Sequence, residues 1–188
     1  LVCVLTIVLT WRHEIVGYRP LTDQLTNAEK VEAEVSAYLE RSHSRVAPIM
    51  IPTGVFIQSV QFLNSSDINF TGIVWQKYAD DVPPEVTRGF LLPERVHSAE
   101  TVVEELFRRE VDGSEVIGWY VDVTVRESFD YSDYPLDRHD AWLRLWHQDF
   151  DRKVILIPDL AAYDSVGSTR TFGIDRALAS GGWRIEDT

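Results

Sequence analysis

The stretch VIGWYVDVTV, residues 116–125, decides the class of fold that the sequence predicts. From Ile117 onward, every second position carries a bulky apolar residue, and the positions between carry Gly, Tyr, Asp and Thr. Because successive side chains of a β-strand point to opposite faces, this alternation predicts a strand with one buried and one wetter face. Asp112 and Gly113, just before it, predict a tight turn.

Other segments on both sides have the composition of strands. Residues 55–63 and 69–78 are rich in Val, Ile and aromatic residues, and turn-forming residues separate them, so they predict a hairpin. Along 141–147, two Trp residues lie on one face and two Leu residues on the other, and either face could be the buried one. The remaining predicted strands are 89–93, 154–157 and one that begins at Trp183.

Two segments have apolar residues at helical spacing. The first is 23–42, and the second is 98–109, where Glu104 and Glu105 stand four residues before Arg108 and Arg109. At least six β runs and only two helices predict a mainly β fold, an antiparallel β-sandwich or barrel with an N-terminal helix and one inserted helix.

Length, charge and cysteine content restrict the classes of partner that we expect for this chain. The chain has 188 residues, a net charge of −12 and a pI near 4.8. That length suits one domain with an extension, and the acidic balance argues against nucleic acid and against anionic lipid surfaces. A ligand attracted by the overall field would be a cation or a neutral molecule. The single cysteine, Cys3, rules out an internal disulfide.

The first ten residues, LVCVLTIVLT, are uncharged and nearly all apolar. A bilayer-spanning helix needs about 20 such residues, so this run predicts the outer end of a membrane or signal-anchor helix, with Trp11 at the headgroup level. A buried strand is the alternative. We therefore expect residues 1–50 to hold this segment and the amphipathic helix, and residues 51–188 to form a β-sandwich that is truncated at its C-terminal end.

The segment Phe129–His139, FDYSDYPLDRH, resembles the Pro-loop of the pentameric ligand-gated ion channel superfamily. That loop has an aromatic residue, Pro, an aromatic or aliphatic residue, Asp, one further residue and Gln. Residues 134–137 fill the pattern, and His139 stands where Gln is usual. The flanking cysteines of animal receptors are absent, as they are in prokaryotic members. Further landmarks of the family fall in order at Trp75, 91–94, 112–113, 143–150 and 182–185.

The resemblance implies an immunoglobulin-like sandwich of the ligand-gated-channel type that assembles as a pentamer. Its ligand would bind at subunit boundaries in a box of aromatic rings, which suits cations. The residues implied at this site are Trp75 and Tyr78 on one subunit, and Trp146 and Phe150 on its neighbour. The residues implied in the loop that couples binding to a pore are Phe129, Asp133, Tyr134, Pro135, Asp137 and Arg138.

Each of these assignments has a simpler alternative. Aromatic residues on strands are usually core, and an acidic loop is often only solvated. His147 with Asp149 or Asp151 leaves a metal site open, although exposed turn residues would explain the same cluster. The sequence lacks G-x-S-x-G, H-E-x-x-H and glycine-rich phosphate-binding motifs, so we expect neither an enzyme nor a cofactor.

The sequence thus predicts the ligand-binding, sensory domain of a membrane receptor. It would lie on the periplasmic or extracellular side, be tethered by flanking helices and be coupled to a channel-like transmembrane region. The alternative is a periplasmic sensor domain of the Cache type, in which a membrane helix is followed by a long helix and a mixed sheet, and which assembles as a dimer.

Overall fold

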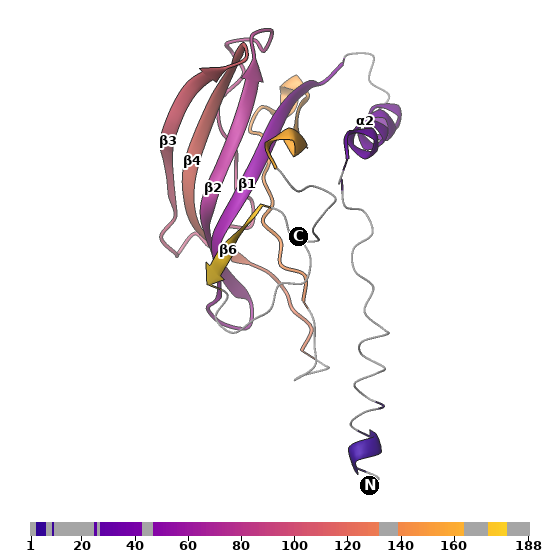
Figure 1. Ribbon diagram of the computed structural model, residues 1–188, viewed down its shortest axis with the longest axis vertical. Coiled ribbons are helices and arrows are strands. Elements are labelled where there is room, and N and C mark those ends of the chain that lie inside the picture. Colours follow the sequence, from indigo (N-terminus) through magenta and orange to yellow (C-terminus); the bar gives the residue numbers. More distant parts are fainter. Residues whose placement is uncertain are drawn as a thin grey trace.

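The computed structural model describes residues 3–6, 9, 25, 27–42, 47–131, 139–163 and 173–179. Its strands form one mixed sheet with the order β3-β4-β2-β1-β5, and β6 also pairs with β1 (Figure 1). The mainly β prediction is confirmed. The strands are β1 (Ile49–Phe62), β2 (Asp67–Ala79), β3 (Val102–Val111), β4 (Ser114–Arg126), β5 (Val154–Pro158) and β6 (Ile174–Ala179), and the helical segments are α2 (Ala28–Ser42), η1 (Phe150–Arg152) and η2 (Leu160–Ala162).

Two antiparallel hairpins form most of the sheet, and residues within each turn determine its geometry. The β1–β2 turn is held by Asn64, whose side-chain oxygen accepts hydrogen bonds from the backbone N–H groups of Ser66 and Asp67. In the β3–β4 turn, Asp112 and Gly113 have φ values of 50° and 72°, the left-handed pair that two-residue hairpins favour. Both predicted turns are confirmed.

The opposite edge of the sheet is built differently. β5 runs parallel to the first half of β1, and β6 runs parallel to its second half. Val55 lies between these two pairings. The Tyr163 hydroxyl accepts a hydrogen bond from the Val55 N–H at 2.7 Å and donates one to the Val55 carbonyl at 2.8 Å. One side chain thereby satisfies the backbone groups that a strand would otherwise pair.

The core lies on one face of the sheet. Alternate residues of β2 and β4 on this face are almost fully buried, including Val74 and Val123. The extended segments 80–101 and 139–149 cover them, with apolar side chains such as Val86 and Leu143 packed inward. Between these two segments the structure shows one isolated bridge, from Leu91 to Trp146. The sandwich is therefore not confirmed, because the described residues form a single mixed sheet under an irregular layer.

The segment 141–147 shows why its prediction as a strand was wrong. The period-two pattern is real: Leu143 and Leu145 pack against the core, while Trp142 and Trp146 are 43% and 49% exposed. Extended backbone is enough to produce such alternation. A strand also needs a neighbouring ladder. Here the Trp142 N–H bonds the Glu127 side chain instead, and the described backbone pairing of the segment is confined to Trp146 with Leu91.

The predicted inserted helix at 98–109 is also wrong, because β3 occupies most of it. A β-bulge shifts the pairing with β4 between Glu105 and Phe107. Glu105 and Arg108 therefore lie on the same face and form an ion pair at 2.8 Å. In a regular strand, residues three apart face opposite ways, whereas in a helix they are neighbours. The bulge thus brings one i, i+3 pair together as a helix would, whereas the expected i, i+4 pairs lie on opposite faces of the strand.

In the N-terminal part, the predicted amphipathic helix is confirmed as α2. α2 begins at Ala28 rather than near residue 23, since the Asn27 side chain caps it by accepting the Lys30 N–H at 2.8 Å. Cys3–Thr6 is helical, and Val4 and Leu5 are 65% and 60% exposed, so a buried strand is wrong for these residues. No described helix has both the length and the apolarity needed to cross a membrane. The strand predicted from Trp183 lies outside the described residues.

Candidate functional site

The two aromatic residues expected together on β2 lie on opposite faces of the sheet. They are three residues apart in a regular strand, so their side chains point in opposite directions. Tyr78 belongs to the buried core and is 1% exposed. Trp75 lies on the other face, which we call the outer face, where it packs across Gly54 of β1. A single pocket cannot be lined by both rings.

Tyr78 is held as a structural residue. Its hydroxyl donates a hydrogen bond to the Gln76 side chain at 2.5 Å and accepts one from the Gly89 N–H at 2.9 Å. The Arg88 guanidinium stacks 4.3 Å from its ring centre and pairs with Glu115. Burial raises the pKa of Tyr78 to about 12, against the opposing effects of the Gly89 hydrogen bond and of Arg88. The ring and hydroxyl thus tie segment 80–101 to the sheet.

Trp75 is fixed by contacts from a distant part of the chain. Its indole N–H donates a hydrogen bond to Asp159 at 2.9 Å, and the Lys77 ammonium bonds the same carboxylate at 3.0 Å. The ring of Tyr163 packs against the indole with 5.5 Å between centroids. Asp159 is only 5% exposed, and these two donors satisfy its buried carboxylate oxygens. The segment after β5 therefore orients the indole.

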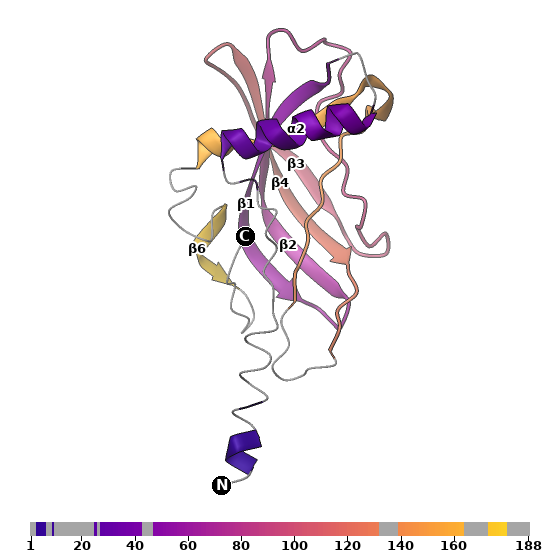
Figure 2. The ribbon, with the colours of Figure 1, turned by 90° about the vertical axis from the view of Figure 1, so that its right-hand side faces the viewer.

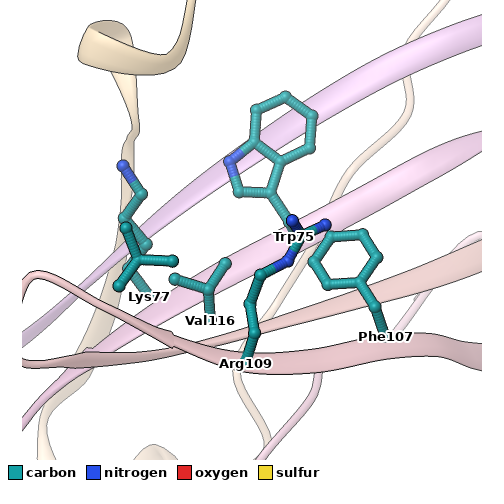
Figure 3. A pocket seen from close by; sticks show the side chains of 6 residues that line it. Trp75, Lys77, Phe107, Arg109 and Val116 are labelled. Atoms are coloured by element: carbon teal, nitrogen blue, oxygen red, sulfur yellow. The ribbon is translucent and has the colours of Figure 1, made fainter.

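Beside Trp75, the outer face is hollowed into an open depression of about 240 Å³ across β2, β4 and β3. Figure 3 shows Trp75 and Phe107 with the Arg109 guanidinium between their rings. Phe107 lies over Gly118, where a Cβ atom would come within 2.3 Å of its ring. We call this the outer-face depression; its lining residues are Trp75, Lys77, Phe107, Arg109, Val111 and Val116.

The two cations of the depression are not equivalent. Lys77 is paired with Asp159 at 2.9 Å. Arg109 stacks 4.2 Å from the Phe107 ring centre, and within the described residues no carboxylate pairs with it. Aromatic walls with one unbalanced guanidinium suit a small molecule that has a flat apolar body and one anionic group. This local preference is opposite to the one that the net charge of −12 indicates for the whole chain.

The two residues expected on the neighbouring subunit lie elsewhere. Trp146 is on the covering segment, where its backbone exchanges hydrogen bonds of 2.7 and 3.0 Å with Leu91. Its half-exposed ring is not among the residues that line the depression. Phe150 begins η1, and its side chain lies outside the described residues. Within one chain, the structure therefore does not bring the four predicted ligand-binding residues together.

His147 and Asp149 connect the two covering segments through hydrogen bonds to Thr87. His147 Nε2 lies 3.0 Å from the Thr87 carbonyl, and its Nδ1 accepts the Asp149 N–H at 3.1 Å. The Asp149 carboxylate in turn accepts hydrogen bonds from the Thr87 N–H and hydroxyl at 2.7 and 2.9 Å. Both ring nitrogens are thus used within the fold. Among the described residues there is no group of three or more potential metal ligands.

The predicted coupling loop is described only at its root. Phe129 packs against Phe62 of β1 with 5.8 Å between centroids, and it packs against His139 at 5.0 Å. The backbone N–H of Glu127 also bonds the carbonyl of Ser66 in the β1–β2 turn at 2.8 Å. The loop therefore leaves the sheet beside this turn. Its other predicted residues, Asp133, Tyr134, Pro135, Asp137 and Arg138, lie outside the described residues.

Sequence reasoning missed four of the residues that shape this site: Phe107, Arg109, Asp159 and Tyr163. The first two were assigned to a helix. Asp159 and Tyr163 act on strands about a hundred residues away in the chain, and no local pattern signals such a contact. Comparison with models of protein families gives no match, and comparison with curated proteins gives none either.

Proposed function

We propose that this chain is the ligand-binding, sensory domain of a membrane receptor and that it lies on the extracytoplasmic side. The outer-face depression is the observation that carries the proposal. One face of β2 and β4 is buried in the core, while the other face of the sheet presents aromatic rings and a guanidinium that no described carboxylate pairs with. Exposed aromatic and charged groups that are held in place by other side chains are typical of binding sites.

The N-terminal segment supports the membrane tether. Val4, Leu5 and Leu9 are at least 58% exposed, so the described fold does not bury them. Apolar side chains in such a row are stabilised by lipid or by another apolar partner. In Figures 1 and 2 the described part of this segment lies beyond the end of the sheet that carries the β1–β2 turn, away from α2.

Two architectures fit such a receptor. The landmarks of the Pro-loop family favour a domain coupled to a channel-like transmembrane region and assembled as a pentamer. The helix α2 followed by one mixed sheet favours the alternative, a Cache-type sensor domain that assembles as a dimer. The sequence that follows Thr188 in the gene separates them: four apolar stretches of about 20 residues support the channel, and one stretch followed by a signalling module supports the sensor.

The site itself is tested with benzoate, a small probe with one ring and one carboxylate. We expect benzoate to shift the NMR signal of the Trp75 indole N–H, which Trp75→Phe identifies by removing it. Arg109→Gln should weaken binding at least tenfold, because a charge-assisted hydrogen bond contributes roughly 1.5–3 kcal/mol. Arg95→Gln is the matched control, since it removes an exposed arginine away from the depression.

Three outcomes would contradict the site. The first is a Trp75 signal that does not move at saturating benzoate. The second is equal affinity in the Arg109→Gln variant and the unaltered chain. The third is equal weakening by Arg95→Gln, which would mean that benzoate responds to overall charge rather than to the depression.

A further inference from the structure

β3 is an edge strand whose outer side is free in the described structure. It pairs with β4 and ends the strand order of the sheet, as the left-hand strand in Figure 1 shows. No described backbone group outside β4 bonds to it. Val103, Leu106 and Val111 are 44%, 52% and 44% exposed along this edge. A free edge presents unpaired backbone N–H and C=O groups that can pair with another strand, and on a charged edge such as β3 the charges decide which strand fits.

The sequence of β3, VVEELFRREV, is complementary to itself in charge when reversed. In an antiparallel pair of two copies, Val102 can stand opposite Val111 of the other copy. The same register places Glu104 opposite Arg109, and Glu105 opposite Arg108. A two-fold axis repeats each contact, so one register forms four pairs of opposite charge and juxtaposes no like charges.

The bulge at Leu106 makes this register possible. Directly opposed residues of an antiparallel pair share a face of the sheet. In a regular strand, Glu104 and Arg109 are five residues apart and would face opposite ways. Because the bulge inserts one residue, both lie on the outer face, opposite Tyr120 and Val116 of β4. Glu105 and Arg108 both lie on the core face for the same reason.

The two charges at the outer positions form no ion pair within the described part of the chain. Glu104 has no ion pair or side-chain hydrogen bond among the described residues, and Arg109 only stacks on Phe107. In contrast, Arg108 already pairs with Glu105 and Glu115 of its own chain. The Glu104–Arg109 contacts would therefore be the new ones between copies.

We propose that two copies of this chain associate edge to edge through antiparallel pairing of β3 about a two-fold axis, with Glu104 of each copy opposite Arg109 of the other. This contact joins the two sheets into one continuous sheet. It goes beyond the proposed function. Because Arg109 also lines the outer-face depression, Glu104 of the other copy and an anionic ligand would compete for the same guanidinium. A two-fold contact closes at two copies, so it fits the dimeric architecture and not the head-to-tail contacts of a ring of five.

Charge reversal tests the pairing by sedimentation velocity over a range of concentrations. The 188-residue chain is kept in a mild detergent, because its first ten residues are apolar. We expect Glu104→Arg to weaken dimerisation at least tenfold, since it creates two like-charge contacts. Adding Arg109→Glu to Glu104→Arg should restore dimerisation, because the exchanged charges again oppose each other. Glu100→Arg changes the net charge equally outside β3 and should leave the dimer intact.

Cysteine pairs test the register. In a Cys3→Ser background, Glu104→Cys with Arg109→Cys should give a disulfide-linked dimer on mild oxidation. Opposed Cα atoms are about 5 Å apart, within disulfide reach, whereas the two positions of one chain are about 16 Å apart. Val103→Cys with Arg109→Cys places the thiols on opposite faces and should give no such dimer.

A chain that is monomeric at all concentrations would overturn the proposal. So would a double charge exchange that fails to restore association, or crosslinking that is equal in the two cysteine pairs. Glu104 does not line the outer-face depression. Benzoate binding that persists in a monomeric Glu104→Arg chain would therefore leave the proposed function standing while this inference is judged separately.

Discussion

Single side chains join segments that the backbone leaves apart. Tyr163 satisfies the N–H and carbonyl of Val55 where neither β5 nor β6 reaches β1. Asp159 joins Trp75 and Lys77 of β2 to the segment after β5. Each of these contacts satisfies a buried or half-buried polar group, and such a group left unpaired costs about 1–3 kcal/mol. The geometry of the candidate site thus depends on two residues that do not line the depression.

At this scale we predict that stability falls at high pH because of Tyr78. Its pKa is near 10 in an unfolded chain and about 12 in the fold, so the folded state keeps the proton longer. The stabilising contribution is complete below pH 10 and is lost as the pH rises towards 12, by no more than about 3 kcal/mol. Urea unfolding across this range measures it.

The matched control for this prediction is Tyr78→Phe. The phenylalanine variant lacks the ionising hydroxyl, so its stability should decline less steeply over the same pH range. It should also be less stable at neutral pH by about 1–3 kcal/mol, because Gln76 and Gly89 lose their shared partner. Parallel pH profiles for the two proteins would show that Tyr78 is not the group responsible.

At the scale of elements, glycines on the outer face let large rings lie flat across the strands. Trp75 covers Gly54 of β1, and Phe107 covers Gly118 of β4. The two rings differ in how firmly they are held. The indole is anchored by Asp159 and Tyr163, whereas the phenyl ring stands on an edge strand under Arg109. The same substitution should therefore have unequal effects at the two glycines.

We predict that Gly54→Ala destabilises the fold by about 1–3 kcal/mol, as overpacking commonly does. The new Cβ would lie 2.1 Å from the indole ring, which its hydrogen bond prevents from moving freely. Gly118→Ala should cost less, because Phe107 can rotate toward solvent. Denaturant unfolding compares the two variants, and an equal or larger loss in Gly118→Ala would contradict the argument.

At the scale of the molecule, acidic surface and apolar N-terminal residues are separated along the chain. The first ten residues carry no charge, while the whole chain has a net charge of −12. If the N-terminal residues insert into lipid, apolar burial and not charge attraction drives the insertion. Anionic headgroups would repel the rest of the chain.

We therefore predict that the chain binds vesicles of neutral phosphatidylcholine at least as well as vesicles that also contain phosphatidylserine. Cys3 is the only cysteine, so one environment-sensitive dye attached to it reports the event. Its emission should shift to shorter wavelength on vesicle addition. Leu5→Glu should reduce the shift strongly, whereas Met50→Glu, at an exposed site at the start of β1, should not. A dye that stays in water would contradict the membrane tether.

Much of the fold was predictable because its signals are local. The alternation along β4 identified a strand with one buried face, Asn64 marked the turn of the β1–β2 hairpin, and Asp112-Gly113 marked a second tight turn, since turn geometry depends on a few neighbouring residues. The helix over 98–109 was predicted wrongly for a local reason as well. Its apolar and charged residues fit helical spacing in the sequence, and only pairing with β4 reveals the strand.

The sequence by itself determined the mainly β class, the β1–β2 hairpin, the turn at Asp112-Gly113 and the acidic, cysteine-poor character of the chain. Only the tertiary structure decided that Trp75 and Tyr78 face opposite ways within the sheet, with one solvated and one buried. It also decided that Leu143 and Leu145, rather than Trp142 and Trp146, face the core. The physical reason is that burial depends on what covers each face, and the covering groups come from residues far away in the chain.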